Sequence, residues 1–390
     1  MRTAKLVAEA DLSLPKDSYI YALRQTNTSL AALSSDDSIR IFDPKTLQLL
    51  PNGIISRVHE SVTCLETYSE DGNVLATAGR DGLVKCWDRR TRKAVMQFQV
   101  PKPQGLSALE VNSAHHAIIA GTELEDRGPG DSFIYAWDAR NASIPRLTLA
   151  ESHTDTITEL CLHPSNPSTL LSASTDGLVS LFDLMQNDED DALRQVINHR
   201  SAVHHAGFAS PTDVYVFGTD ETLAFYQYQD SDDPSPELAP VKIGDVREKL
   251  TCEYVVNVYR SAGANVVVAG NHSEQRLDLL PLHTPPIGQP LNYSCTLEDC
   301  LRLPGSHGEE IVRDVFIDPQ SSTIFTCGED GKVRSWSAEG FGGQEQVEQQ
   351  ANATATSVDS AEEKHPKEKK HKDKHKKKDK DKSKDRYKPY

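Results

Sequence analysis

The sequence predicts an all-β fold, a seven-bladed β-propeller followed by a basic C-terminal tail, and three observations lead to this prediction. A short pattern recurs seven times within the first 340 residues. Successive copies lie 44 to 56 residues apart, which is the length of a propeller blade with four strands and variable loops. After residue 340 apolar residues become sparse and lysines accumulate, so the propeller is expected to end there.

Each copy of the pattern places an acidic residue six positions before an aromatic or large apolar residue, with Ile, Val or Leu midway. The clearest copies read GRDGLVKCWD (79–88), STDGLVSLFD (174–183) and GEDGKVRSWS (328–337), whereas HSEQRLDLLP (272–281) keeps only the spacing. The seven acids are Asp36, Asp81, Asp131, Asp176, Asp220, Glu274 and Asp330. The copies at residues 36, 220 and 274 keep only fragments of the fuller pattern, so blades one, five and six are expected to be less regular.

The segments around each copy predict the strands of one blade. An upstream run such as SVTCLET (61–67) predicts the inner strand, and a short apolar run such as NVLATAG (73–79) predicts the second. A tight turn at Asp-Gly, Asp-Asp or Asp-Glu then leads into the third strand. The last copy ends near Trp336 without a fourth strand, while KLVAEA (5–10) belongs to no complete blade. We therefore expect residues 5–10 to close the last blade of a propeller domain spanning residues 1–340.

The C-terminal region differs from the propeller in charge and composition. Residues 341–363 are polar without apolar periodicity and predict a disordered linker, and residues 364–390 predict a disordered Lys-rich tail. The whole chain has a net charge of −16; residues 361–390 hold 14 basic against 7 acidic residues, or +7, which leaves −23 for residues 1–360. The protein is therefore an acidic body with a basic tail.

The repeats resemble those of WD-repeat propellers, in which a His, a Ser or Thr, the turn Asp and a Trp form a buried hydrogen-bonded set. By position, two copies match this set in full and a third replaces the Trp with Phe182. The matching residues are His59, Thr77, Asp81 and Trp87; His153, Ser172, Asp176 and Phe182; and His307, Thr326, Asp330 and Trp336. The resemblance implies a structural role for these side chains.

A narrower resemblance rests on three stretches of the chain. SHTDTITELCLHPSNPSTLLSASTDGLVSLFD (152–183), DEDDAL (188–193) and IGDVRE (243–248) are similar to the WD repeat-containing protein 89 family. That resemblance implies an intracellular propeller of the nucleus, extending to the nucleolus and the cytoplasm.

The sequence contains no catalytic or nucleotide-binding signature, and we expect no enzyme activity, no catalytic residues and no cofactor. The recurring acids appear once per blade, which indicates a structural role. His204 and His205 lie in an inner-strand run, where neighbours are expected to point to opposite faces, so no metal site is predicted. The seven cysteines form no Cys-x-x-Cys pair, so neither a disulfide framework nor a zinc site is indicated. No run is long and apolar enough to span a membrane.

The two ends of the propeller offer separate candidate surfaces. The top end holds the turn acids and the loops that carry the histidine of the WD-repeat set. From their positions in the repeat we expect seven residues there to contact a partner: Ser35, Glu60, Arg80, Thr154, Thr175, Glu309 and Glu329. The bottom end carries WDRR (87–90) and WDAR (137–140). In WD-repeat substrate receptors this motif contacts the adaptor of a cullin-4 ubiquitin ligase. The resemblance implies the same adaptor contact for Trp87, Asp88, Arg90, Trp137, Asp138 and Arg140. Alternatively, each Arg only caps the end of its strand.

The charge distribution predicts the class of partner. An acidic propeller repels nucleic acid and attracts basic proteins, so a monomeric scaffold for ribosomal proteins or histones, in ribosome biogenesis or chromatin, is expected. The acidic loops 186–193 and 228–240 project this charge furthest, although negative charge also serves solubility alone. The tail resembles those of nucleolar proteins, which implies nuclear import; weak nonspecific RNA contact or folding back onto the propeller are the alternatives.

Overall fold

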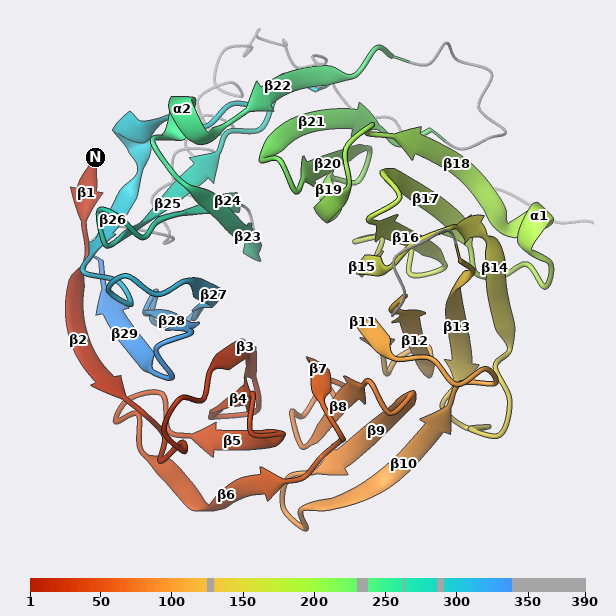
Figure 1. The fold of residues 1–390 in the computed structure, drawn as a ribbon, viewed down its shortest axis with the longest axis horizontal. Coiled ribbons are helices and arrows are strands. Elements are labelled where there is room, and N and C mark those ends of the chain that lie inside the picture. The colour runs from red at the N-terminus through yellow and green to blue at the C-terminus, as the bar shows by residue number, and fades with distance from the viewer. Residues whose placement is uncertain (125–129, 230–237, 262–263, 286–290, 339–390) are drawn as a thin grey trace, which may run out of the picture. The chain divides into compact units, whose positions relative to one another are not determined.

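Seven antiparallel sheets follow one another around a ring in this computed structural model (Figure 1). The structure describes residues 1–124, 130–229, 238–261, 264–285 and 291–338. The predicted all-β, seven-bladed propeller is confirmed. The chain divides into two compact units, residues 1–343 and 344–390, and all seven blades belong to the first. The predicted linker (341–363) and Lys-rich tail (364–390) lie outside the described residues.

Each blade is a sheet whose inner strand comes first in the chain order of that blade. Blade 1 comprises β3 (Ile20–Gln25), β4 (Leu30–Ser34), β5 (Ser38–Phe42) and β6 (Leu49–Ser56). Blade 2 comprises β7 (Val62–Thr67), β8 (Val74–Gly79), β9 (Leu83–Asp88) and β10 (Lys93–Gln99). Blade 3 comprises β11 (Leu106–Asn112), β12 (Ala117–Thr122), β13 (Ser132–Asp138) and β14 (Leu147–His153). Blade 4 comprises β15 (Ile157–Leu162), β16 (Thr169–Ser174), β17 (Leu178–Asp183) and β18 (Leu193–Asn198).

The second half of the ring repeats this arrangement with two additions from the N-terminus. Blade 5 comprises β19 (Val203–Ser210), β20 (Asp213–Gly218), β21 (Thr222–Gln227) and β22 (Val241–Asp245). Blade 6 comprises β23 (Tyr254–Ser261), β24 (Ala264–Asn271), β25 (Arg276–Leu282), β26 (Leu301–Pro304) and β1 (Arg2–Thr3). Blade 7 comprises β27 (Val312–Ile317), β28 (Ile324–Gly328), β29 (Val333–Ser337) and β2 (Lys5–Ala10). Three helical turns, α1 (Glu189–Ala192), α2 (Arg247–Leu250) and η1 (Leu297–Asp299), lie between strands.

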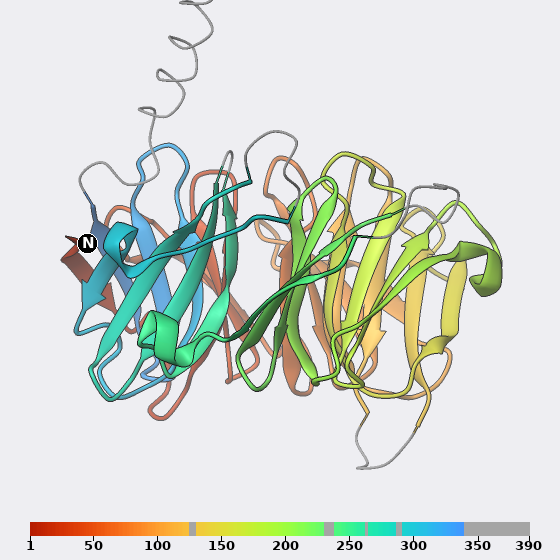
Figure 2. The ribbon, with the colours of Figure 1, turned by 90° about the horizontal axis from the view of Figure 1, so that it is seen from above.

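The second strand of each blade is apolar because both of its faces are covered. Every residue of β4, β16 and β20 is buried, whereas five of the seven residues of the outer strand β10 are exposed. The cores lie between adjacent blades; Leu171 and Val179 of blade 4, for example, pack with Phe208 and Val214 of blade 5. Figure 2 shows the sheets standing side by side around the ring. Burial of apolar area between blades therefore drives the assembly.

The turn between the second and third strands requires a left-handed backbone at the residue after the repeat acid. Gly82, Gly177 and Gly331 adopt φ values of +71°, +87° and +70° there, which glycine tolerates without strain. Blades 1 and 5 place Asp37 (φ +58°) and Glu221 (φ +61°) at the same position. The side chains of these two acids accept hydrogen bonds from backbone N–H groups of the next blade, which glycine could not do.

Every inner strand contains a register shift near its first residue. The shift lies between Ile20 and Ala22 in blade 1 and recurs in all seven blades, between Val62/Cys64, Leu106/Ala108, Ile157/Glu159, Val203/His205, Val255/Asn257 and Val312/Asp314. Such a bulge adds one residue to the strand and interrupts the alternation of side chains.

The bulge in blade 5 overturns the expected orientation of His204 and His205. Their ring centroids lie only 4.0 Å apart, so the two side chains do not point to opposite faces. The reason is the register shift between Val203 and His205, which breaks the two-residue period on which the expectation depended.

The N-terminal segment closes the ring by joining two blades. Arg2–Thr3 pairs in parallel with Leu301 and Arg302 of blade 6, and Lys5–Ala10 pairs antiparallel with β29 of blade 7. Ala4, between the two strands, is buried in the cluster that contains Trp336. Glu9 forms ion pairs with Lys332 (2.9 Å) and Arg334 (3.2 Å). The N-terminus therefore supplies the outer strand of blade 7 and a fifth strand to blade 6.

Deleting residues 1–12 is expected to destabilise the propeller by several kcal/mol, because the deletion removes both ladders and uncovers the Trp336 cluster. Thermal denaturation should show a fall in Tm of about 10 °C. The matched control is Val7→Ser, at an exposed position of β2, which should change the free energy of unfolding by less than about 0.5 kcal/mol. An unchanged Tm after the deletion would count against closure by this segment.

Candidate functional site

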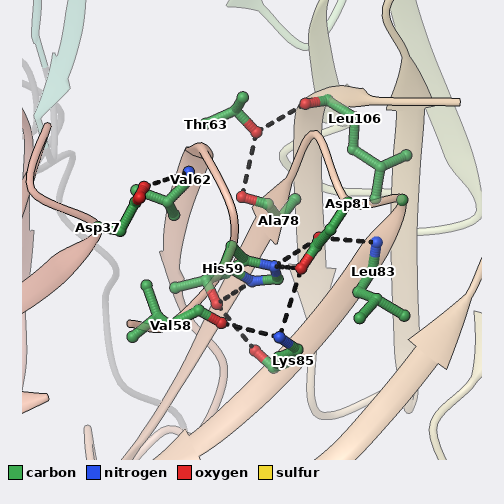
Figure 3. Close-up of polar contacts among 12 residues, drawn as sticks. Asp37, Val58, His59, Val62, Thr63, Ala78, Asp81, Leu83, Lys85 and Leu106 are labelled. Atoms are coloured by element: carbon green, nitrogen blue, oxygen red, sulfur yellow. Dashed lines mark hydrogen bonds and ion pairs between the residues drawn. The ribbon is translucent and has the colours of Figure 1, made fainter. Parts of the chain in front are cut away.

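A hydrogen-bonded set of four side chains, His59, Thr77, Asp81 and Trp87, occupies the interior of blade 2, and Figure 3 shows the contact of His59 with Asp81. His59 Nδ1 lies 2.8 Å from Asp81 Oδ1, and His59 Nε2 lies 2.8 Å from Thr77 Oγ1. The indole of Trp87 donates to the same hydroxyl at 2.9 Å. Lys85 adds a bond from its Nζ to the carbonyl of Val58 (2.9 Å) and approaches Asp81 at 3.4 Å. The set provides hydrogen-bond partners for the buried His59 and Thr77 and for the half-buried Asp81 and Trp87, which would be costly to leave unpaired.

Blades 4 and 7 hold the other two predicted sets. His307 Nδ1 lies 2.7 Å from Asp330 Oδ1 and its Nε2 lies 2.8 Å from Thr326 Oγ1, to which Trp336 also donates. In blade 4, His153 contacts Asp176 (3.0 Å) and Ser172 (2.7 Å). Phe182 is fully buried in the core between blades 3 and 4. The structure thus brings the residues of each predicted set together, and in the second set His153, at the end of β14 in blade 3, reaches across to blade 4.

Burial and pairing shift the pKa values of these groups. Burial lowers the pKa of His59 and of His307 below its ordinary value, although hydrogen bonds to Asp81 and Asp330 oppose the shift. Burial acts to raise the pKa of Asp330, but the hydrogen bonds from His307 and Arg334 and the charge of Arg334 outweigh it, so the pKa of this carboxyl is lowered. These shifts favour neutral histidine beside a charged carboxylate at neutral pH.

Blade 5 contains a histidine that sequence reasoning missed. His199 precedes the inner strand of this blade, and its Nε2 lies 3.1 Å from Thr222 Oγ1, which in turn donates to Asp220 at 2.7 Å. The signal was present in the spacing, since His199 lies 21 residues before Asp220 and His59 lies 22 residues before Asp81. The hydroxyl, however, comes from the third strand of the blade, whereas in blades 2, 4 and 7 it comes from the second.

Blade 6 replaces the histidine set with buried ion pairs in which an acid occupies the position that a basic residue holds in blades 2 and 7. Asp278 is fully buried at the position where blades 2 and 7 hold Lys85 and Arg334. Its carboxylate is paired with Arg276 and with Arg302, whose Nε lies 2.8 Å from Asp278 Oδ1. A buried carboxylate needs such partners because an unpaired one would be strongly destabilising.

Blades 1 and 3 depart from the set in different ways. Asp36 of blade 1 accepts hydrogen bonds from Ser34 and Ser38 and pairs with Arg40, so its carboxylate is satisfied without histidine. In blade 3, Ala120 stands where blade 2 has Thr77, and the indole nitrogen of Trp137 has no hydrogen-bond partner. Four-stranded sheets form in both blades, so the irregularity expected of blade 1 lies in its interior; blade 3, of which no irregularity was expected, also departs from the set.

The top-end residues predicted as partner contacts fall into two groups. Glu60, Arg80, Thr154 and Glu309 are exposed, whereas Ser35, Thr175 and Glu329 are half-buried. Arg80 pairs with Glu123 of blade 3 (2.7 Å), and Glu329 pairs with Arg313. Ser35 and Thr175 hydrogen-bond to neighbouring backbone groups. Glu60 and Glu309 are therefore the exposed acids at this end whose side chains are most accessible.

At the bottom end the two Trp-Asp-x-Arg segments have the same local geometry. Arg90 and Arg140 fold back onto Asp88 and Asp138, two residues earlier, with N–O distances of 2.8 and 2.5 Å. The arginine hydrogen bonds lower the pKa of both carboxyls well below the ordinary range. The guanidinium side chains are 66% and 69% exposed. Each Arg therefore caps its strand end and still presents a surface to solvent.

The inner strands line a central cavity that contains charged side chains from several blades. Arg24 lies between Glu66 (2.8 Å) and Asp314 (2.9 Å), which joins blades 1, 2 and 7. A cavity of about 400 Å³ borders these three residues. Burial, with the charge of Glu66 nearby, raises the pKa of Glu110 to about 8, so this acid is protonated at neutral pH.

The structure offers little for metal or thiol chemistry within the part of the chain that it describes. His205 contacts Glu159 at 3.1 Å, but the described residues contain no group of three or more potential ligands for a metal ion. All seven cysteines are free, and burial raises the pKa of Cys64, Cys86 and Cys161 to about 12. No helix among the described residues is long and apolar enough to cross a bilayer.

The repeat geometry agrees with comparison to known proteins. The family description "WD domain, G-beta repeat" matches residues 54–88, 145–183 and 298–337. The chain belongs to the WD-repeat proteins. An uncharacterized WD repeat-containing protein of Saccharomyces cerevisiae is 36% identical over 266 residues, which cover 68% of this chain and 64% of that protein. One from Schizosaccharomyces pombe is 27% identical over 330 residues, 82% of this chain and 95% of that protein.

The expected similarity to the WD repeat-containing protein 89 family is also confirmed. The WD repeat-containing protein 89 homolog of Dictyostelium discoideum is 25% identical over 327 residues, which cover 82% of each protein. The similarity to this WD-repeat protein thus extends over most of the propeller.

Thr326→Val is expected to lower the free energy of unfolding by about 1–3 kcal/mol, because it leaves the ring nitrogen of His307 and the indole of Trp336 without their shared partner. Urea denaturation measures the change. Thr148→Val, at an exposed position of β14, makes the same substitution without breaking a buried set and should cost less than about 0.5 kcal/mol. Equal losses in the two variants would show that the set does not contribute to stability.

The WD-repeat propeller is expected to lose stability as the pH falls from 7.5 to 5.5. The folded state lowers the pKa of His59 and His307, so the unfolded state takes up protons first, near pH 6.5, and stability falls below that pH. Asp176 and Asp330, whose pKa values are lowered, add a second loss near and below pH 4. Urea denaturation from pH 7.5 down to about pH 3 checks both steps. In His307→Gln the first step should be shallower, and an identical slope would contradict its assignment to histidine.

Proposed function

We propose that this WD-repeat protein is a non-catalytic interaction scaffold whose acidic propeller binds or escorts basic proteins, such as ribosomal proteins or histones. The observation that carries the proposal is the charge separation, −23 over residues 1–360 against +7 over residues 361–390. Such a charge attracts and orients basic partners and repels nucleic acid from most of the surface. Propellers of this family act in protein–protein interaction, which supports a scaffold.

The distribution of the acids supports the same proposal. Asp81, Asp176 and Asp330 are paired inside their blades and contribute little to the outer field. Exposed acids without a side-chain partner lie instead on loops, for example Glu60 and Glu309. Since these acids belong to no repeated interior set, their role is more simply explained by what they present to a partner.

The second candidate function is that of a substrate receptor for a cullin-4 ubiquitin ligase. The specific observation in its favour is the pair of equivalent, exposed arginines Arg90 and Arg140 on neighbouring blades. Each follows a Trp-Asp dipeptide, as in WD-repeat receptors, and each is held in a defined orientation by its Asp. The other explanation, a strand-end cap, accounts for the same geometry without a partner.

Affinity capture with the full chain from nuclear extract, followed by mass spectrometry, separates the two candidates. A scaffold for basic proteins should recover histones or ribosomal proteins at about 0.1 M salt and lose them at about 0.5 M. The double variant Arg90→Ala/Arg140→Ala should leave this recovery unchanged. Selective loss of a ligase adaptor in that variant would favour the receptor, and recovery of no basic protein at low salt would contradict the scaffold.

We further propose that the protein resides in the nucleus and nucleolus, with a cytoplasmic pool, and that its Lys-rich tail provides import. Residues 364–390 are rich in lysine but hold no Phe or Trp and only Tyr387 and Tyr390 for stacking on bases, which supports an import signal over an RNA-binding role. Removing residues 341–390 from a fluorescent fusion should shift the protein to the cytoplasm. Unchanged nuclear fluorescence would reject import by the tail and leave nonspecific RNA contact or masking of the propeller as its role.

A further inference from the structure

A cleft of about 390 Å³ opens at the bottom end between blades 3 and 4. Its apolar lining comes from Ile119 of β12, Ala136 of β13, and Leu184 with Met185 from the loop after β17. Met185 is 67% exposed and Ile144, in the loop between β13 and β14, is 66% exposed. Exposed apolar side chains beside an apolar hollow are typical of an interaction site.

The cationic side chains at this cleft are already engaged. Arg140 is paired with Asp138, and the guanidinium of Arg146 donates to the carbonyl of Leu184. These contacts hold the walls of the cleft in place. The charge of Arg140 is compensated by its carboxylate partner, whereas Arg146, bonded to a neutral carbonyl, keeps its positive charge.

An acidic helical turn begins four residues after Met185. The turn α1 (Glu189–Ala192) lies at the outer rim of the ring between β14 and β18 (Figure 1). Asp188 caps it by accepting a hydrogen bond from the backbone N–H of Asp190 at 3.0 Å. Because three residues span at most about 11 Å, Asp188 lies within that distance of the exposed methionine, and Asp190 and Asp191 follow two and three residues later along the chain.

The acidic turn is fixed to blade 3 by one side chain. The carboxylate of Glu189 accepts hydrogen bonds from the backbone N–H of Ala150 (2.5 Å) and of Glu151 (3.1 Å) and from the hydroxyl of Ser152 (2.5 Å). Ala192 is buried beneath the turn. The two remaining acids, Asp190 and Asp191, are exposed and make no side-chain hydrogen bond or ion pair with the described residues. Their charges are therefore held in a fixed place with no partner.

We infer that the cleft between blades 3 and 4, with the acidic turn beside it, is the docking site for a basic segment of a partner protein that carries an apolar side chain among its lysines or arginines. The apolar side chain enters the cleft against Leu184 and Met185, and the flanking cations face Asp190 and Asp191. The inference rests on the proposed function, since it assigns the site at which the acidic propeller binds its basic partners. Charge complementarity favours this occupant over an acidic peptide.

Fluorescence anisotropy with the full chain tests the assignment. The probes are two short labelled peptides of lysine and arginine, one with Leu-Phe at its centre and one with Ala-Ala. The wild-type protein should bind the Leu-Phe peptide at least about fivefold more tightly. Met185→Ser should remove most of this preference, whereas Val95→Ser, at another exposed apolar position, should retain it.

The charge requirement has its own matched pair of variants. Asp190→Asn/Asp191→Asn should weaken binding of the Leu-Phe peptide about tenfold, and Glu309→Gln/Glu310→Gln, which removes the same charge at the top end, should weaken it less than about threefold. All substituted positions are exposed, so the fold should be retained. Equal effects of the two pairs would overturn the site.

The remaining outcomes separate the inference from the proposed function. Salt-sensitive binding of both peptides with no preference for Leu-Phe would overturn the cleft and leave the basic-protein scaffold standing. Absence of binding to either peptide would overturn both. Tighter binding by the full-length variant Tyr387→Ser/Tyr390→Ser would show that the chain's own tail, in which Tyr387 is flanked by Arg386 and Lys388, occupies the cleft, and would overturn the assignment to a partner.

Discussion

The ring depends on one repeated contact, in which a side chain of each blade bonds a backbone group near the start of the next inner strand. Buried backbone groups must be paired, and in blades 2, 3, 4 and 7 the bulge of the inner strand places a side chain where it can do so. In blades 2, 3 and 4 this side chain is a hydroxyl. The contacts are Thr63 Oγ1 to Leu106 O (2.6 Å), Ser107 Oγ to Ile157 O (2.6 Å) and Thr158 Oγ1 to Val203 O (3.1 Å).

The other four junctions meet the same requirement with acids or a tyrosine that accept from a backbone N–H. The contacts are Asp37 to Val62 N (2.8 Å), Glu221 to Val255 N (3.2 Å), the Tyr254 hydroxyl to Val312 N (2.9 Å) and Asp314 to Leu23 N (2.8 Å). Asp37 and Glu221 accept the left-handed turn position for this purpose. The constraint therefore fixes geometry while leaving the residue type free, which explains how weak repeats such as blade 6 remain in the ring.

This freedom also determines how much could be predicted from the sequence. The blade count follows from the spacing of the seven acids, because that spacing matches the length of a four-stranded blade. The set of His59, Thr77, Asp81 and Trp87 follows from the positions of these residues in the WD-repeat pattern that the chain resembles. His199 was missed because its hydroxyl partner comes from a different strand. The ion pair of Asp278 with Arg302 joins two strands of blade 6 that are separated by a long connection, so no local sequence pattern predicts this ion pair. The adjacent rings of His204 and His205 could not be foreseen without the bulge.

Periodicity offers a physical criterion for separating structural charges from those that act on partners. An acid that recurs once per blade lies where the fold has already provided a donor, as Asp81 and Asp330 do, and its charge is compensated inside the propeller. An acid outside the period, such as Asp190, has no such donor and remains exposed to solvent. Ordering Asp190 in the capped turn reduces its conformational entropy, and its carboxylate forms no hydrogen bond or ion pair with the described residues that would offset this loss. The Glu189 clamp orders that turn, so the binding chemistry of this propeller is best sought among its aperiodic acids.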